Sequence, residues 1–440
     1  MTLVPSFVDL LQPLTAVMTA PTFQNLVTIL TGWVFAPRRT VTGMIVAAQA
    51  IDDKHHSTFH RLFAKASWSP DTLGLVVFRL IEPWLDPAAS VMLGLDDTLA
   101  RKRGLKMFGV GMHHDPMLST RKTTITHWGH SWVVLSVIVS FPRLPFCDGR
   151  YFALPILFRL YLNQSAAAKH RRAYRTRPQL AVEMLHVLSS ACKNRRFHVI
   201  ADSAYGGQSV LNHLPDLFDL TSRLHLDARL YEAPPTRQPN TPGRPRKRGR
   251  RLPTPRQMLQ QRGRRIALNI YGRTDRVRLC HTEARVYATP HRPLRIVAVQ
   301  PLTGGRPAQA FYSTCRHTEA EQVLTWYAMR WSVEVTFHDA KQHLGFEQPQ
   351  CHSRRAVERT APTAMWLYSL IVLWFAKVGH RLYQPPHRPW YRHKPHPSFA
   401  DMLATLRSQS IRQQVLSTGL SGRGSRKVLK TLCHAVQQAA

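Results

Sequence analysis

The chain has 440 residues, and its 60 Lys and Arg against 25 Asp and Glu give it a formal net charge of +35. A hydrophobic content of 44% excludes a disordered basic tail, and the length allows two or three domains with buried cores. Because so large an excess of positive charge repels itself in a folded protein, we expect a polyanionic partner. Nucleic acid is the first candidate for that partner, and an anionic membrane surface is the second.

Cysteine spacing and hydropathy indicate the cellular compartment in which the protein is expected to act. The six cysteines form no CxxC pair, which indicates free thiols in a reducing compartment. Three of them precede a histidine, but neighbouring residues on one element chelate zinc poorly, so a zinc site is the less favoured alternative. The most apolar run, residues 364–376, is too short to span a bilayer, and the N-terminus lacks a basic stretch followed by a cleavage site. We therefore expect a soluble cytoplasmic protein with no membrane partner.

Residues 1–85 are predicted to form a helical domain. The runs LVTILTGWVF and TVTGMIVAAQAI carry apolar residues at helical spacing, and HHSTFHRLFAKASW has the composition of a basic, aromatic helix. Since the chain as a whole needs a polyanionic partner, this domain is predicted to bind DNA.

Residues 86–205 are predicted to form the first part of a mixed α/β core. Four runs rich in β-branched and apolar residues are of strand type: VMLGLDDT, HSWVVLSVIVSF, YFALPILFRLYL and FHVIA. The first run ends in Asp96 and Asp97, and the last is followed by Asp202 and a glycine turn. Three strands, a helix and a fourth strand indicate a mixed sheet.

Residues 206–320 break this pattern and are predicted to be a β-rich insertion. Within it, residues 233–256 are rich in proline and hold eight Arg or Lys and no acid, which predicts a solvated, mobile arm. The run GRPRKRG resembles hooks that enter an A·T-rich minor groove, but general contact with phosphates is the favoured interpretation. The residues expected to make these contacts are Arg244, Arg246, Lys247 and Arg248.

Residues 321–380 are predicted to complete the core, and residues 381–440 to form a basic linker and a helical C-terminal segment. In the first of these ranges, YAMRWSVEVTFHDAKQHLGF reads as one amphipathic helix. Four of its polar residues fall within roughly 60° of one another around the helix axis, beside an apolar face. These residues are Tyr327, Arg330, Glu334 and Lys341. The neighbouring Trp326 and Trp331 are interpreted as core residues, with stacking on an extruded base as the alternative.

Acids are scarce in this chain, so their positions are informative. Carboxylates at the ends of neighbouring strands, with one more from a helix packed on the sheet, can converge on one point. The acids with these positions are Asp96, Asp97, Asp202 and Glu334. Carboxylates gathered in a pocket repel one another unless a cation neutralises them, and ligation by oxygen alone favours Mg²⁺ or Mn²⁺. Two such ions suit in-line phosphoryl transfer, so the acids are predicted to be both metal ligands and catalytic residues.

The spacing Y-x2-R-x3-E-x6-K resembles the YREK signature of one group of DDE transposases from bacterial insertion sequences. LDDT at residues 95–98 and IADSAYGG around Asp202 are similar to the segments that carry that family's first and second catalytic Asp. The similarity extends over roughly residues 90–380, with weaker similarity at both ends.

This resemblance implies an RNase H-like core that is interrupted by a β-rich insertion between Asp202 and Glu334. It implies Glu334 as the third metal ligand, with Tyr327, Arg330 and Lys341 binding the phosphates of the transposon end. It also implies a bacterial, nucleoid-associated, cut-and-paste transposase that acts on terminal inverted repeats and target DNA, as a homodimer in the synaptic complex. The alternatives are a non-enzymatic DNA-binding protein derived from a transposase and a related Mg²⁺-dependent nuclease.

The first catalytic Asp has two candidates. A D-x-T/S pattern in the family points to Asp96, whereas an E-D-T variant points to Asp97. Asp97 is slightly favoured, because related cut-and-paste enzymes carry an acid immediately before this position.

Overall fold

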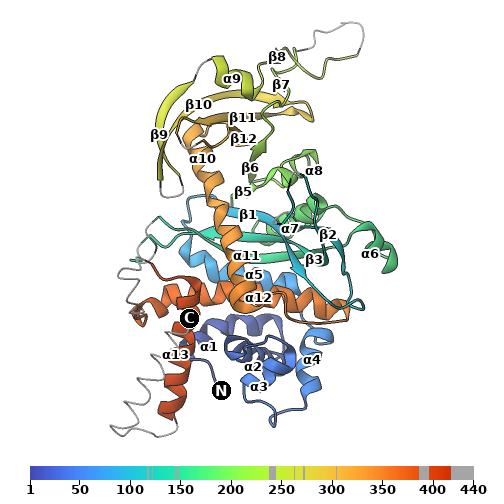
Figure 1. The fold of residues 1–440 in the computed structure, drawn as a ribbon, viewed down its shortest axis with the longest axis vertical. Coiled ribbons are helices and arrows are strands. Elements are labelled where there is room, and N and C mark those ends of the chain that lie inside the picture. Colours follow the sequence, from blue (N-terminus) through green and yellow to red (C-terminus); the bar gives the residue numbers. More distant parts are fainter. Residues whose placement is uncertain are drawn as a thin grey trace. The chain divides into compact units, whose positions relative to one another are not determined.

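The structure, a computed structural model, describes residues 1–115, 118–120, 122–142, 144–145, 147, 149–236, 244–261, 263–270, 273–303, 305–385 and 396–417. It divides into two compact units (Figure 1). The first unit consists of Met1–Leu85, Asp97–Arg175 and Glu334–Ala440. The second unit consists of Asp86–Asp96 and Thr176–Val333. The boundaries fall inside strand β1 (Val91–Arg101) and helix α11 (Trp331–Leu344), so each of these elements contributes residues to both units.

Residues 1–85 of the first unit are helical, as the apolar spacing predicted. The helices are α1 (Pro5–Leu11), α2 (Ala20–Phe35), α3 (Val41–Ala47), α4 (His56–Ala64) and α5 (Pro70–Ile81), with short 3₁₀ turns at Gln12–Val17 and Glu82–Trp84. Helices α2 and α3 approach closely at Gly32, where an added Cβ would lie 1.9 Å from the backbone oxygen of Met44. Only glycine allows this approach of the two backbones.

The strands of the first unit are arranged around β3 (Thr126–Val139). Strands β2 (Gly111–His114) and β4 (Phe152–Tyr161) both pair antiparallel with β3, and β1 is its other neighbour. The short helix α6 (Gln164–Lys169) follows β4. The predicted apolar runs therefore form strands.

Helix α12 (Arg354–Lys377) is the central helix of the first unit. Its apolar residues are almost all buried, and it packs with α5 against β4. The Trp366 indole donates to the backbone oxygen of Ile156 at 3.0 Å, so a buried polar group is satisfied where the helix meets the strand. Helix α13 (Phe399–Ser417) packs on α12. Among the described residues, no helix is long and apolar enough to cross a membrane.

The second unit contains a mixed sheet. Strand β1 is parallel to β5 (Phe197–Ala201), which is parallel to β6 (Phe218–Leu224). Antiparallel pairing then continues through β12 (Gln309–Ser313), β11 (Thr289–Pro301) and β10 (Arg273–Val286), which pairs with both β9 (Arg264–Ile270) and β7 (Leu230–Tyr231). Strand β8 (Arg251–Leu252) pairs with β7. The helices of the unit are α7 (Arg177–Ala191), α8 (Gln208–Leu211), α9 (Pro255–Gln261) and α10 (Ala320–Met329).

The prediction of a single helix through Tyr327 and Lys341 is wrong in one respect, because the structure has two helices that meet at Arg330. Helix α10 ends at Met329, and α11 begins at Trp331. The backbone N–H of Arg330 donates to Tyr327 O at 3.2 Å, and that of Val333 donates to Arg330 O at 2.9 Å. These i to i−3 bonds tighten the chain into a 3₁₀-like turn, which changes the angular position of every later residue. The signature residues are therefore divided between two helices, with Tyr327 in α10 and Glu334 and Lys341 in α11.

Candidate active site

Two of the predicted acids lie where the parallel pairing of β1 with β5 ends in the second unit: Asp96 is in the middle of β1, which continues to Arg101, and Asp202 directly follows β5. The register of β1 and β5 pairs Gly94 with Ile200 and Leu95 with Ala201, so the next residues are Asp96 and Asp202. Residues in register on parallel strands point to the same face of the sheet. Asp96 and Asp202 are therefore on a common face at one edge of this sheet.

Helix α10 covers that face. His198 lies four residues before Asp202, so side-chain alternation puts it on the same face of the sheet. The centroid of its imidazole ring lies 4.1 Å from the centroid of the Trp326 ring of α10. Trp326 thus packs on the sheet, but it is only partly buried, so the interpretation as a core residue holds in part. Trp331 differs from that interpretation, because it is 55% exposed.

Arg330 contacts Asp96 directly. Its guanidinium donates to Asp96 Oδ2 at 2.8 Å, and both side chains are more than four-fifths buried. The same guanidinium lies 5.6 Å from the centroid of the Tyr327 ring. The sequence predicted that Arg330 would bind DNA phosphates; in the structure it neutralises one of the acids.

Tyr327 is buried near Arg330. Its ring is buried against Phe311, with 4.6 Å between centroids. Burial raises the pKa of the Tyr327 hydroxyl, the charges of Arg330 and Arg223 oppose this, and the charge of Asp202 adds to it. Tyr327, Arg330, Asp202 and Arg223 are therefore electrostatic neighbours within the second unit.

The turn that carries Asp202 is fixed by its neighbours on β6 and β12. Asp202 caps the short 3₁₀ turn Ser203–Tyr205 by accepting from the backbone N–H of Ala204. Its backbone oxygen accepts from Ser222 Oγ at 2.8 Å, and Gly206 O accepts from the Tyr312 hydroxyl at 2.6 Å. These bonds hold the acid in one position, which a ligand or catalytic group requires.

Asp97, Glu334 and Lys341 belong to the first unit. In a regular strand Asp97 points to the face opposite Asp96. Glu334 lies in the first turn of α11, and the half-buried Lys341 lies seven residues further along the same helix. Burial lowers the pKa of the Lys341 ammonium, while the nearby charges of Glu347, Arg101 and Asp115 also act on it.

The acids offer carboxylate oxygens alone, and these are the donors that Mg²⁺ and Mn²⁺ prefer. The donor chemistry therefore fits a divalent cation. Within the described part of the chain, however, no group of three or more His, Cys, Asp or Glu side chains is arranged to hold a metal ion. The pairing of Asp96 with Arg330 shows that this acid accepts a positive partner.

The basic arm is anchored at its C-terminal end. The guanidinium of Arg248 lies 3.5 Å from the centroid of the Tyr287 ring and 5.6 Å from that of Tyr231. Arg251 pairs with Tyr231 where β8 meets β7. Arg244, Arg246 and Lys247 are exposed. Residue 243 and the preceding residues back to 237, part of the predicted mobile arm, lie outside the described residues.

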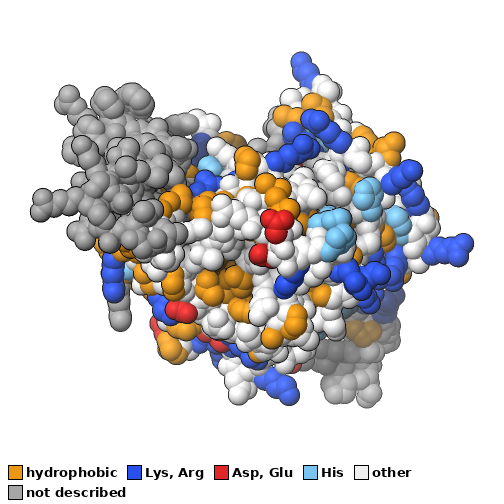
Figure 2. Space-filling model, turned by 90° about the horizontal axis from the view of Figure 1, so that it is seen from below, with side chains coloured by type: hydrophobic (Ala, Val, Ile, Leu, Met, Phe, Trp, Pro, Cys, Tyr) orange, Lys and Arg blue, Asp and Glu red, His pale blue; other side chains and the backbone are white. Residues whose placement is uncertain are grey.

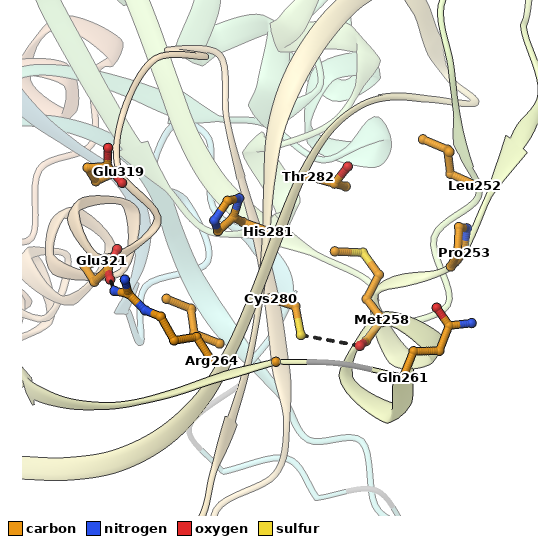
Figure 3. Close-up of a pocket in the computed structure, with 12 residues that line it drawn as sticks. Leu252, Pro253, Met258, Gln261, Arg264, Cys280, His281, Thr282, Glu319 and Glu321 are labelled. Atoms are coloured by element: carbon orange, nitrogen blue, oxygen red, sulfur yellow. Dashed lines mark hydrogen bonds and ion pairs between the residues drawn. The ribbon is translucent and has the colours of Figure 1, made fainter.

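A pocket of about 1090 Å³ lies in the insertion, and none of the predicted site residues lines it (Figure 3). Cys280, one of the residues weighed for zinc, donates from Sγ to Met258 O at 3.4 Å. Across the pocket, Arg264 forms an ion pair with Glu321. The described cysteines are free, as their spacing predicted.

Three residues near the predicted site were missed by the sequence prediction: Arg223, Arg101 and Asp115. Arg223 lies on β6, which pairs with β5, so only the strand order brings it near Asp202. Arg101 lies four residues after Asp97, and this i+4 spacing was the one available signal. Asp115 directly follows β2, and nothing in its local sequence distinguishes it from a turn residue.

The acid pair, the arginines beside it and the high net charge are features of an enzyme that cleaves nucleic acid. On the face drawn in Figure 2, Lys and Arg side chains are spread widely and acids are few. The sequence model of the DDE superfamily endonucleases matches residues 13–283, which is more than half of the chain. The protein therefore belongs to the DDE superfamily endonuclease family. No curated protein matches the chain.

The matched range contains Asp96, Asp97 and Asp202 and ends before Glu334. DDE superfamily nucleases generally use divalent metal ions and act on DNA. Family membership therefore confirms the broader predictions of a DDE-type nuclease and a nucleic-acid partner.

Proposed function

We propose that this protein is a transposase that cuts DNA at the ends of an insertion sequence and joins them to target DNA. The observation that carries this proposal is the alignment of Asp96 with Asp202 where the pairing of β1 with β5 ends, with Arg330 bound to Asp96, in a member of a DDE endonuclease family. The YREK spacing is the feature that favours a transposase over another DNA-cleaving nuclease.

The strand arrangement supports an RNase H-like core. In the first unit, β3 pairs antiparallel with β4 and neighbours β1; in the second, β1, β5 and β6 run parallel. A sheet that begins with antiparallel strands and continues with parallel ones is the mixed sheet that the resemblance implied. The following strands of the second unit, β7 to β12, make up the β-rich insertion before α10.

We assign Asp96, Asp202 and Glu334 as the three acids of the active site. The structure gives a reason to prefer Asp96 over Asp97, because Asp96 shares a face with Asp202 and Asp97 alternates away from it. We therefore propose Asp96 as the first catalytic acid, whereas sequence analysis slightly favoured Asp97. A bound Mg²⁺ or Mn²⁺ would supply Lewis acidity toward the phosphate and lower the pKa of an attacking water or hydroxyl.

The chain's own hydrogen-bond donors would position the DNA. Arg330 and Tyr327 lie beside the acids, so they are placed to contact a phosphate that enters the site. Before DNA binds, Arg330 offsets the repulsion between Asp96 and Asp202. The reaction is phosphoryl transfer: water hydrolyses the phosphodiester at the transposon end, and the freed 3′-OH then attacks a second phosphodiester.

A DNA-cleavage assay tests this proposal. The substrate is a duplex that carries the inverted repeats flanking the gene, and the control is the same duplex with scrambled repeats. We expect cleavage at the repeat ends and joined products, only with Mg²⁺ or Mn²⁺. Specific binding without cleavage would favour a DNA-binding derivative, and cleavage indifferent to the repeats would favour a nuclease. Light scattering of the complex with DNA would test the homodimer.

We also propose that DNA contacts extend to the arm and to residues 1–85. In the N-terminal segment, a cavity of about 330 Å³ between α2 and α4 is lined by cations and by groups that donate hydrogen bonds, which are suited to phosphate. Its polar lining residues are Thr22, Asn25, Thr58, Arg61 and Lys65.

Replacing residues 244–247 with Gly and Ser, or Arg61 and Lys65 with Gln, should weaken binding to every DNA. Contacts with phosphate carry little sequence information, so the ratio of affinities for end and random DNA should stay within about twofold. Fluorescence anisotropy on both duplexes measures this. Residues 248–251 are kept because Arg248 and Arg251 have structural contacts. If the arm variant lost only its preference for A·T-rich ends, the minor-groove interpretation would be correct.

A further inference from the structure

Strands β9 and β10 form an antiparallel ribbon in the β-rich insertion, inside the second unit (Figure 1). Its register pairs Arg265 of β9 directly with Arg278 of β10. Partners in an antiparallel pair point to the same face, and so does every second residue along a strand. Arg276 is two residues before Arg278 and therefore lies on the same face. We call these three residues the arginine face of the ribbon.

The burial of the ribbon agrees with this alternation. On the opposite face, Leu268, Val277 and Leu279 are 8%, 3% and 3% exposed. On the arginine face, Arg278 is half-buried and the other two arginines are exposed. The apolar face of the ribbon is therefore buried in the protein, whereas the arginine face is open to solvent and to a partner.

The charges of the ribbon are balanced on the apolar face and unbalanced on the arginine face. Asp275 of β10 alternates onto the apolar face and forms an ion pair with Arg306. Arg264, also on the apolar face, forms an ion pair with Glu321. Within the described part of the chain, no arginine of the arginine face forms an ion pair with a carboxylate. The arginine face therefore presents an uncompensated positive charge.

This arrangement is unfavourable in the free protein. Like charges directly opposite each other on an antiparallel pair are destabilising, and Arg265 and Arg278 are such a pair. Arg278 is also held in place, because its Nη1 donates to the backbone oxygen of Leu259 at 3.3 Å. The repulsion would be offset by an anionic partner bound across the two strands.

The dimensions of the arginine face suit the phosphates of a DNA duplex. Cross-strand partners have Cβ atoms roughly 5 Å apart, and residues two apart along a strand are separated by roughly 7 Å. Duplex DNA carries one negative charge per about 1.7 Å of its axis, so a patch of this size faces more than one phosphate. Arginine also matches the geometry of phosphate oxygens with its forked donors.

We propose that the arginine face of the β9–β10 ribbon binds phosphates of the DNA on which the enzyme acts. This inference rests on the proposed action on DNA, and it assigns a DNA-binding surface to the folded part of the insertion, in addition to the basic arm. Contacts with phosphate carry little sequence information, so the surface contributes to the affinity for every DNA.

The test is the salt dependence of DNA binding by the double variant Arg265→Gln/Arg276→Gln. Loss of two phosphate contacts should make the slope of log K against log salt concentration less steep by about 1.8, which is about 0.9 for each contact. Arg278 is left unchanged because of its backbone contact. The variant Arg265→Lys/Arg276→Lys keeps both charges, so its slope should stay at the wild-type value.

The matched control is Arg256→Gln/Arg316→Gln. It removes the same charge from two exposed arginines of the second unit, but these are paired with carboxylates, Arg256 with Asp227 and Arg316 with Glu283. The control should keep the wild-type slope. An equal change in the control and the test variant would show a general effect of net charge and would overturn the inference.

Thermal melting without DNA separates a binding role from a structural one. Arg265→Gln removes the repulsion with Arg278, so its Tm should be no lower than that of the wild type, whereas a structural role predicts a lower Tm. If the double Gln variant does not fold, Arg265→Gln alone decides, with an expected change in slope of about 0.9.

An unchanged slope in the folded Gln variants, or loss of folding in both, would overturn the inference and leave the proposed function standing. The absence of salt-dependent DNA binding by the wild type would instead contradict the proposed function itself.

Discussion

Asp202→Asn and Glu334→Gln should each reduce DNA cleavage by about a thousandfold, which corresponds to about 4 kcal/mol of transition-state stabilisation. Each change keeps the shape of the side chain and removes one carboxylate charge, so the fold should persist. DNA binding should persist as well, because removing a negative charge from a cationic surface does not weaken attraction for phosphate. Single-turnover cleavage and anisotropy measure the two properties separately.

Matched controls exist for both changes. Asp216 is an exposed Asp in the second unit, and Glu319 is an exposed Glu that precedes α10. Asp216→Asn and Glu319→Gln should cleave DNA at the wild-type rate. Full activity in Asp202→Asn or Glu334→Gln would contradict the assignment of that acid. Equal losses in a variant and its control would indicate a general effect of charge.

Much of the fold was predictable from local patterns. The β-branched apolar runs predicted β1, β3, β4 and β5, and Asp202 directly follows β5 as predicted. The prediction that the first strand ends at Asp96 and Asp97 is wrong, because β1 continues to Arg101. Such patterns are informative because a strand that is buried on both faces must be apolar along its whole length. Three strands followed by a helix and a fourth strand also indicated the mixed sheet.

The details of the site were not predictable, because they depend on register and on small changes in helical twist. A shift of one residue in the pairing of β1 with β5 would align Asp97, and not Asp96, with Asp202. Arg330 lies at the tight turn between α10 and α11, and helical periodicity does not report its contact with Asp96. The pairing of Arg101 with Asp115 joins the end of β1 to the end of β2, and no periodic pattern reports such a contact.

Asp96→Asn should abolish cleavage as severely as Asp202→Asn, whereas Asp97→Asn should retain activity within about tenfold of the wild type. The two residues are adjacent aspartates, so composition and net charge are identical in the two variants. The difference comes from the register, which puts Asp96 on the face of Asp202. Cleavage by the two variants, measured side by side under single-turnover conditions, compares them directly.

Asp96→Asn should also change DNA binding, because Asp96 holds the guanidinium of Arg330 at 2.8 Å. Without that carboxylate Arg330 is available to a phosphate, so the variant should bind DNA at least as tightly as the wild type while it fails to cleave. Tight binding together with lost cleavage excludes unfolding as the cause. If Asp97→Asn were the inactive variant and Asp96→Asn cleaved normally, strand alternation would have been the wrong guide, and Asp97 would be the first catalytic acid.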